Sequence, residues 1–350
     1  MLAGYALKEV FLYRQPGPTT EMGMKYLKLY MLLLALITGL VTIQTSAAQA
    51  GQVRVVASIQ PLALIAAALL SDDGMDSEKL SNEVSLERLM NSMGSPHGYA
   101  LRPSEMRRLY DADVILWVGP ALESYLIKAM SNASEQNTII TAMDLVSLRH
   151  VGFVEKKLEL SNNDQSDQVH NAHHNHNESI DPHLWLDPEN ALPIARALVD
   201  AVVVKQPHLA KALEQRFVNF SQQIKQLDHE LSAQLNPLSE KHFVVFHDAY
   251  GYLLSRYQLT NYRAFTINPE RKPGAKTLFA LHQYMDDNKV NCVFSEPQFS
   301  TANASLVSGG GRRMRRGVID PLGSNFKLGN TAYVQMLASI GRDISTCLSQ

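Results

Sequence analysis

Residues 207–238 read PHLAKALEQRFVNFSQQIKQLDHELSAQLNPL, and this segment decides how the two halves of the chain are joined. Apolar residues recur along it at steps of three and four, at Leu209, Leu213, Phe217, Phe220, Ile224, Leu227, Leu231 and Leu235. That spacing puts them on one face of a helix. No Gly or Pro interrupts the run, so the pattern predicts one stiff helix about 45 Å long. A coiled-coil partner is the alternative, but a strut packed across two lobes suits the flanking sequence better.

The halves on either side alternate short apolar strands with helical segments. Predicted strands cover residues 53–58, 113–119, 243–246, 263–267, 290–295 and 317–319; predicted helices cover 61–70 and 104–110, and one begins at Pro120. This alternation predicts an α/β fold with parallel sheets covered on both faces. We expect an N-terminal lobe at 51–206, a connecting helix at 207–238 and a C-terminal lobe at 239–350, because about 300 residues suffice for two cores.

The first fifty residues have the order of a secretory signal peptide. Basic Lys25 and Lys28 precede an apolar run at 29–43, and Ala-Gln-Ala ends at Ala50. We therefore predict cleavage near Ala50 and a soluble periplasmic product, with residues 1–23 as a mis-assigned upstream start. The apolar run is short for a membrane span, and no cysteine at the cleavage point suggests a lipid anchor.

The chain has two cysteines, Cys292 and Cys347. In an exported protein such a pair is most simply a disulfide, with two buried free thiols as the alternative. Basic and acidic residues nearly balance, at 32 against 34. This balance gives no electrostatic reason to expect a nucleic-acid partner.

Four of the twelve histidines lie in one polar tract inside a predicted loop at 164–179: His170, His173, His174 and His176. Imidazole is the commonest ligand for zinc and copper, so this composition indicates a secondary metal site. A solvated insertion without metal is the alternative.

Three further histidines stand in positions typical of ligand sites. His247 follows the predicted strand at 243–246, while His97 and His183 lie in turns bounded by proline. In open α/β sheets ligands gather beyond the carboxyl ends of the strands, so these three side chains can converge. Any one of them alone would more often be a surface or capping histidine.

The sequence around these histidines resembles the cluster A-I solute-binding proteins of ABC metal importers, and most closely the zinc-binding members. The motifs are GSPHGYALRPS at 94–104, WVGP at 117–120, DPHLWLDP at 181–188, FHDAYGY at 246–252, SEPQF at 295–299 and DPLG at 320–323. The resemblance implies two Rossmann-like α/β lobes joined by a long backbone helix, with one metal ion in the cleft between them.

Carried over by motif, the resemblance implies zinc ligands at His97, His183 and His247, and a family disulfide at Cys292 and Cys347. Pro96 stands where some zinc members have a Glu, so we expect Asp320 or a water as the fourth ligand. Glu296 is expected to orient an imidazole, with a surface carboxylate as the alternative. Three imidazoles favour zinc over manganese.

The resemblance further implies high-affinity capture of Zn²⁺ in the periplasm and delivery to an ABC permease of the inner membrane, by a monomer that is not an enzyme. A periplasmic zinc chaperone could act at the histidine tract. A three-histidine zinc hydrolase is one alternative, but the sequence has no HExxH helix, nucleophile elbow or evident general base. A periplasmic metal buffer or adhesin without a transporter would use the same site.

Overall fold

A computed structural model describes residues 51–72, 80–91, 93–133, 135, 137–145, 180–266, 269–270, 274–299 and 314–350. The predicted signal peptide at 1–50 and the histidine tract at 170–176 lie outside these residues. Residues 51–350 form one unit of contacts. In the part of the chain that is described, no helix has both the length and the apolar character needed to cross a bilayer.

The N-terminal lobe contains a parallel four-stranded sheet in the order β2-β1-β3-β4. Its strands are β1 (Val53–Ala57), β2 (Val84–Arg88), β3 (Val114–Trp117) and β4 (Thr138–Thr141), and its helices are α2 (Gln60–Leu70), α3 (Pro103–Tyr110), α4 (Ile127–Ser131) and α5 (Ala191–Lys205). The sequence pattern missed β2 and β4. Both are edge strands with partly exposed residues, so neither carries the continuous apolar run of a central parallel strand.

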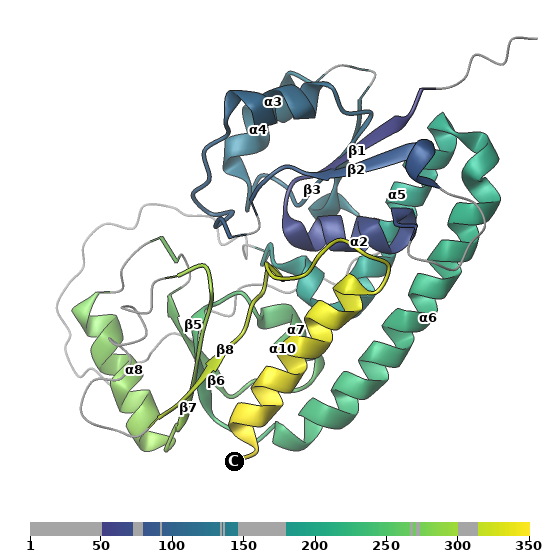
Figure 1. Cartoon of the computed structure of the whole chain (residues 1–350). Helices are drawn as coiled ribbons and strands as arrows, with labels where there is room; N and C mark the ends of the chain where they lie inside the picture. Colours follow the sequence, from purple (N-terminus) through teal and green to yellow (C-terminus); the bar gives the residue numbers. More distant parts are fainter. Residues whose placement is uncertain are drawn as a thin grey trace, which may run out of the picture. The chain divides into compact units, whose positions relative to one another are not determined.

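The C-terminal lobe repeats this plan with a parallel sheet in the order β6-β5-β7-β8 (Figure 1). Its strands are β5 (Phe243–His247), β6 (Tyr262–Thr266), β7 (Cys292–Ser295) and β8 (Arg315–Val318), and its helices are α7 (Gly251–Arg256), α8 (Ala275–Asp287) and α10 (Ala332–Leu348). Two parallel sheets with helices on their faces confirm the predicted α/β class.

The helix predicted from Pro120 begins later than expected. A turn follows β3, then a 3₁₀ turn at Ser124–Leu126, and α4 starts only at Ile127. Gly119 has a φ of 140°, a conformation that favours glycine, and its carbonyl accepts bonds from the backbone N–H groups of Leu122 and Glu123. The turn that this glycine makes displaces the helix along the chain.

The connecting helix α6 (Ala210–Leu235) has 26 residues, so it is about 39 Å long and shorter than predicted. Turns of 3₁₀ helix at Pro207–Leu209 and Asn236–Leu238 occupy the ends of the predicted range. Pro237 lies in the second of these turns, where a proline cannot continue an α-helix. The predicted apolar face packs against α10, α5 and α2. In Figure 1, α6 and α10 run side by side.

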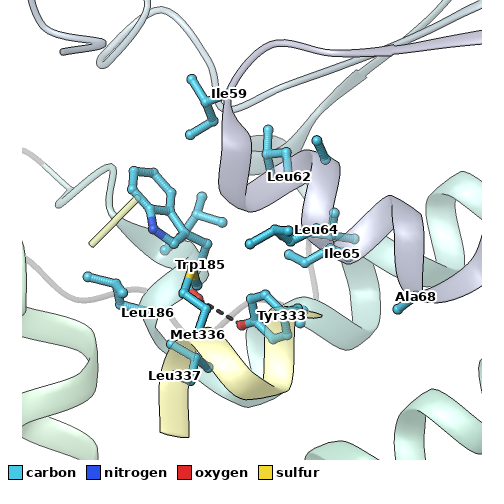
Figure 2. Packing of buried hydrophobic residues seen from close by; sticks show 14 of the residues in the cluster. Ile59, Leu62, Leu64, Ile65, Ala68, Trp185, Leu186, Tyr333, Met336 and Leu337 are labelled. Atoms are coloured by element: carbon cyan, nitrogen blue, oxygen red, sulfur yellow. Dashed lines mark hydrogen bonds between the residues drawn. The ribbon is translucent and has the colours of Figure 1, made fainter. Parts of the chain in front are cut away.

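One continuous hydrophobic core extends through both lobes. Figure 2 shows Leu62, Leu64 and Ile65 of α2 near Trp185, and near Tyr333 and Met336 of α10. Smaller apolar clusters lie elsewhere in each lobe, one around Ile115 and Leu126 and one around Phe246 and Met285. Because the largest core is shared, wide hinge opening of the lobes would expose much apolar surface.

A disulfide between Cys292 and Cys347 joins β7 to α10, as predicted. Both cysteines are buried, and the bridge closes a loop of 55 residues. In the chain-entropy model such a loop constrains the unfolded chain by roughly 4 kcal/mol. The bridge therefore ties the last helix, which carries much of the shared core, to the sheet that ends at the candidate site.

Candidate metal centre

His247 is the last residue of β5, at the carboxyl end of the C-terminal sheet. Its side chain is 3% exposed, and among the described residues neither ring nitrogen has a hydrogen-bond partner. Leaving buried polar atoms without partners costs free energy. An imidazole kept in this state at a strand end is therefore a strong candidate for binding a ligand.

His183 is held in one tautomer by Asp181, a residue that the sequence analysis did not single out. The Asp181 carboxylate accepts a bond from the His183 backbone N–H at 2.9 Å, and its Oδ1 lies 2.7 Å from Nδ1. When Asp181 is ionised, above its raised pKa of about 7, this pairing places the imidazole proton on Nδ1 and leaves the lone pair of Nε2 free for a metal. A carboxylate two residues before a candidate ligand is the sequence signal that could have identified it.

The turn that carries His183 is fixed by residues of the C-terminal half. The Tyr252 hydroxyl donates to the Asp181 carbonyl at 2.9 Å, and the Trp185 indole donates to the Pro321 carbonyl at 2.8 Å. Tyr333 on α10 donates to the Trp185 carbonyl at 2.7 Å, the bond drawn in Figure 2. His183 is 2% exposed and belongs to the C-terminal lobe by its contacts.

His97 reaches the same place from the N-terminal lobe. It lies in a loop between β2 and α3 and is only partly buried. Its Nε2 lies 3.3 Å from Nε2 of His183. Two nitrogens bound to one tetrahedral zinc at about 2.0–2.1 Å are about 3.3–3.4 Å apart, so this pair already has the spacing of zinc ligands.

Potential ligand atoms of His97, His183 and His247 all lie within 4.8 Å of one another. Among the residues that the structure describes, this is the one group of three or more His, Cys, Asp or Glu side chains with such spacing. The structure therefore brings together the three histidines predicted from sequence. Three converging nitrogen donors match the preference of zinc rather than that of magnesium, calcium or manganese.

Burial lowers the pKa of two of these histidines, His97 and His183. Desolvation, with smaller effects of His183 and His247, lowers the pKa of His97 from 6.5 to about 2. Desolvation and the neighbouring His247 likewise hold the pKa of His183 well below 6.5. Neutral imidazole is the metal-binding form, so both rings are ready for a cation at neutral pH.

Glu296 is placed to orient His247, as expected. Its side chain is 4% exposed, and Oε1 lies 3.5 Å from Nδ1 of His247. Burial raises the pKa of Glu296, while His247 opposes that rise. A carboxylate beside Nδ1 directs Nε2 toward the cluster, as Asp181 does for His183.

Asp320 is not brought into the cluster, which runs against the expected fourth ligand. Its Oδ1 accepts bonds from Gln298 Nε2 at 2.7 Å and from the Leu322 backbone N–H at 3.1 Å. Its Oδ2 accepts bonds from the backbone N–H and the hydroxyl of Ser324 at 2.6 and 2.5 Å. The carboxylate is therefore occupied by the turn at 320–324.

The three histidines open into one cavity. Its remaining lining comes from Ser95, Pro96, Trp185, Glu296, Gln298, Phe299, Pro321 and Leu322. Most of this lining is apolar. Such a cavity excludes bulk water and strengthens the interaction of a bound cation with the few polar groups that face it.

Zinc binding should release fewer than three protons at pH 5.5. Imidazoles with an ordinary pKa of about 6.5 would be largely protonated there and would release up to three. His97 and His183, with lowered pKa values, carry no proton to release. Burial raises the pKa of Asp181 to about 7. Near neutral pH, the proton released when zinc binds is therefore expected to come from this carboxyl group. Calorimetry in buffers of different ionisation enthalpy measures the number of protons released per zinc ion bound. A release of three protons at pH 5.5 would contradict the lowered pKa values of His97 and His183.

The lowered pKa values of His97 and His183 also determine how the stability of the folded protein changes with pH. The unfolded chain binds protons at these two imidazoles below about pH 6.5, whereas the folded chain does not until pH falls much further. Their contribution to stability is therefore fully present above pH 6.5 and is lost as pH falls toward about 2. Asp181 acts in the opposite direction, since its raised pKa favours the folded state as pH falls through 7.

Residues 55–347 match the model of a family described as zinc-uptake complex component A, periplasmic. A high-affinity zinc uptake system protein ZnuA of Yersinia pestis is 33% identical over 305 residues, covering 84% of this chain and 91% of that protein. A protein of the same name from Haemophilus ducreyi is 31% identical, covering 85% and 93%.

Solved structures show the same fold. A crystal structure of ZnuA superimposes with a TM-score of 0.66 at 20% identity, covering 85% of this chain and 99% of that one. The periplasmic zinc binding protein TroA from Treponema pallidum gives a TM-score of 0.68 at 19% identity, covering 86% and 100%. Both likenesses extend over the two lobes described above.

Proposed function

Because the chain belongs to the family of periplasmic zinc-uptake complex component A proteins, we propose that it binds one zinc ion through His97, His183 and His247. The family predicted from the motifs is thereby confirmed. The protein captures zinc in the periplasm for an ABC-type uptake system. The observation that carries the site assignment is the convergence of three imidazoles, two of them already at the spacing of zinc ligands.

Capture needs little rearrangement in this proposal. Asp181 holds the tautomer of His183, Glu296 does the same for His247, and His97 completes the site from the opposite lobe. The shared core limits the movement of the lobes, so only a modest adjustment accompanies binding. The loaded protein then docks on the permease, which opens the site and takes the ion. We propose that the capture protein acts as a monomer.

Catalysis is not part of this proposal, although three histidines and one open position also describe a hydrolytic zinc centre. The two carboxylates beside the histidines, Asp181 and Glu296, face imidazole Nδ1 atoms. They orient ligands in this arrangement and are not free to act as a general base. The other alternative from the sequence, a metal buffer or adhesin without a transporter, is not favoured by the family match, and growth under zinc chelation tests the uptake role directly.

The test of the proposed site is metal titration of demetallated mature protein, with the bound ion identified by native mass spectrometry. One tightly bound zinc per chain, displaced only by a strong chelator, is the expected result. A folded protein that takes up no zinc, or that prefers manganese at equal concentrations, would overturn the assignment. Growth of a deletion strain under chelation, restored by the intact gene, tests the uptake role separately.

Deleting residues 169–177 should remove a weak zinc-binding phase and leave the tight phase intact. Four histidines within seven residues can offer two or three ligands to one ion. Each residue that binding must fix costs about 1–2 kcal/mol of backbone entropy, so we propose a secondary site of low affinity. Such a site could accept zinc from a periplasmic chaperone.

Calorimetry on the deletion variant measures both phases of zinc binding. A variant of full length with the four histidines replaced by Asn is the matched control, since it removes the ligands and keeps the length of the segment. Loss of the tight phase in both variants, with the fold retained, would mean that the tract belongs to the primary site.

A further inference from the structure

Gln298 has an unusual position beside the metal cavity. It follows β7 in the segment Ser295-Glu296-Pro297-Gln298-Phe299 and is partly buried. Gln298 lines the same cavity as the three histidines. Nε2 donates to Asp320 Oδ1 at 2.7 Å, whereas Oε1 is buried and has no hydrogen-bond partner among the residues that the structure describes. A buried acceptor without a partner is costly, so we expect a molecule bound in the cavity to donate a hydrogen bond to Gln298 Oε1.

The orientation of the Gln298 amide is fixed by Asp320. An ionised carboxylate has only acceptors, so it must face the NH₂ group of the amide and not its oxygen. Asp320 is itself immobilised by the backbone N–H groups of Leu322 and Ser324. A flipped amide would place two acceptors against each other. Oε1 is consequently held on the side of the amide away from Asp320.

The other polar groups of the cavity differ from Gln298 in what they face, although Glu296 Oε1 also has no hydrogen-bond partner among the described residues. The Trp185 indole donates to the Pro321 carbonyl, and the Glu296 carboxylate lies beside His247 Nδ1. Pro96, Phe299, Pro321 and Leu322 contribute apolar surface. No fourth His, Cys, Asp or Glu among the described residues joins the histidine group. A zinc ion with three protein ligands completes its tetrahedron with water.

We propose that Gln298 is a positioning residue that accepts a hydrogen bond from the water bound to zinc as its fourth ligand. Asp320 then acts on the metal through Gln298 and not by direct coordination. This inference rests on the proposed three-histidine site. The amide oxygen serves the water better than it serves the metal, because zinc selects nitrogen, sulfur and carboxylate ligands. The fourth position therefore favours a ligand that can donate a hydrogen bond to Gln298 Oε1.

The test replaces Gln298 by Leu, with Gln298→Met as a second variant that keeps the length of the side chain. Gln223→Leu is the matched control, because Gln223 is also partly buried with an unpartnered Oε1 but lies on α6, outside the cavity lining. Zinc affinity is measured by chelator competition. Azide affinity is measured on Co²⁺-loaded protein from the visible absorption spectrum, since azide replaces water and has no proton to donate.

Removing Gln298 Oε1 should lower zinc affinity about 10- to 100-fold, the usual effect of losing a group that orients a metal ligand. Azide affinity should rise about tenfold in the same variants, because a coordinated azide no longer leaves a buried acceptor unpaired. The Gln223→Leu protein should match wild type in both measurements. Opposite changes in the two affinities are the signature of the proposed role.

A parallel loss of zinc and azide affinity would overturn the proposal, because it would mean that Gln298 only supports the fold. Unchanged affinities in both Gln298 variants would overturn it as well. Failure of the underlying three-histidine site gives a different result, since wild-type protein would then bind neither one zinc nor one Co²⁺ ion.

Discussion

Replacing His247 by Ala should lower zinc affinity by about two to three orders of magnitude. Structural zinc sites bind with about 10–16 kcal/mol shared among four ligands, so one ligand accounts for about 2.5–4 kcal/mol. His247 Nε2 has no hydrogen-bond partner among the described residues, and Nδ1 has only the 3.5 Å approach of Glu296 Oε1, so the change removes one long contact and no short hydrogen bond. The zinc-free variant should therefore keep its fold while the affinity falls. Chelator competition measures the affinity, and circular dichroism checks the fold.

His229→Ala is the matched control for this change, since His229 is exposed on α6 and outside the histidine group. It should bind zinc as tightly as wild type. Equivalent losses are expected for His97→Ala and His183→Ala. Unchanged affinity in the His247→Ala protein would remove this residue from the site, and with it the proposed ligand set.

Replacing Arg256 by Ala should destabilise the protein by about 3 kcal/mol, the lower end of the cost of breaking a buried ion pair. Arg256 on α7 contacts three carboxylates: Asp228 at 2.6 Å, Glu189 at 3.0 Å and Asp187 at 3.2 Å. Asp187 is completely buried, so the variant would remove the guanidinium that contacts a carboxylate shielded from water. Glu189 is largely exposed and contributes little.

Urea unfolding of the zinc-free protein measures this loss. Arg196→Ala is the control, since Arg196 pairs at 2.8 Å with the exposed Glu214, where water screens the interaction. The control should lose only a small fraction of what Arg256→Ala loses. Equal midpoints for the two variants would show that the Arg256 cluster does not stabilise the fold.

The fold was largely predictable because apolar residues in the helices and central strands follow regular patterns along the sequence. An apolar face without Gly or Pro gave α6, and central strands such as β3 and β5 are short apolar runs. The ends of α6 were not predictable from periodicity alone, because Leu209 continues the apolar pattern into the first 3₁₀ turn and Leu235 carries it to the last residue of the helix. The edge strands β2 and β4 were missed because their composition reflects partial exposure.

The sequence selected the three histidines that converge in the structure, but not the residues that support them. His97, His183 and His247 stand in distinctive motifs, which explains why the sequence sufficed to select them. Asp320 also stands in a family motif, but the turn at 320–324 supplies N–H donors that occupy its carboxylate. Asp181 and Gln298 matter through the direction of single hydrogen bonds, which depends on backbone geometry that no spacing rule records.

The attachment of His183 has a consequence for how such proteins can be recombined. The turn at 181–188 precedes α6 in the sequence, yet Tyr252, Pro321 and Tyr333 fix it from beyond that helix. A chimera joined at the helix would combine this turn from one parent with anchors from another. Exchange of the C-terminal lobe between relatives would preserve the metal site only if the turn at 181–188 were exchanged together with it. The segments that must be exchanged together are therefore not contiguous in the gene.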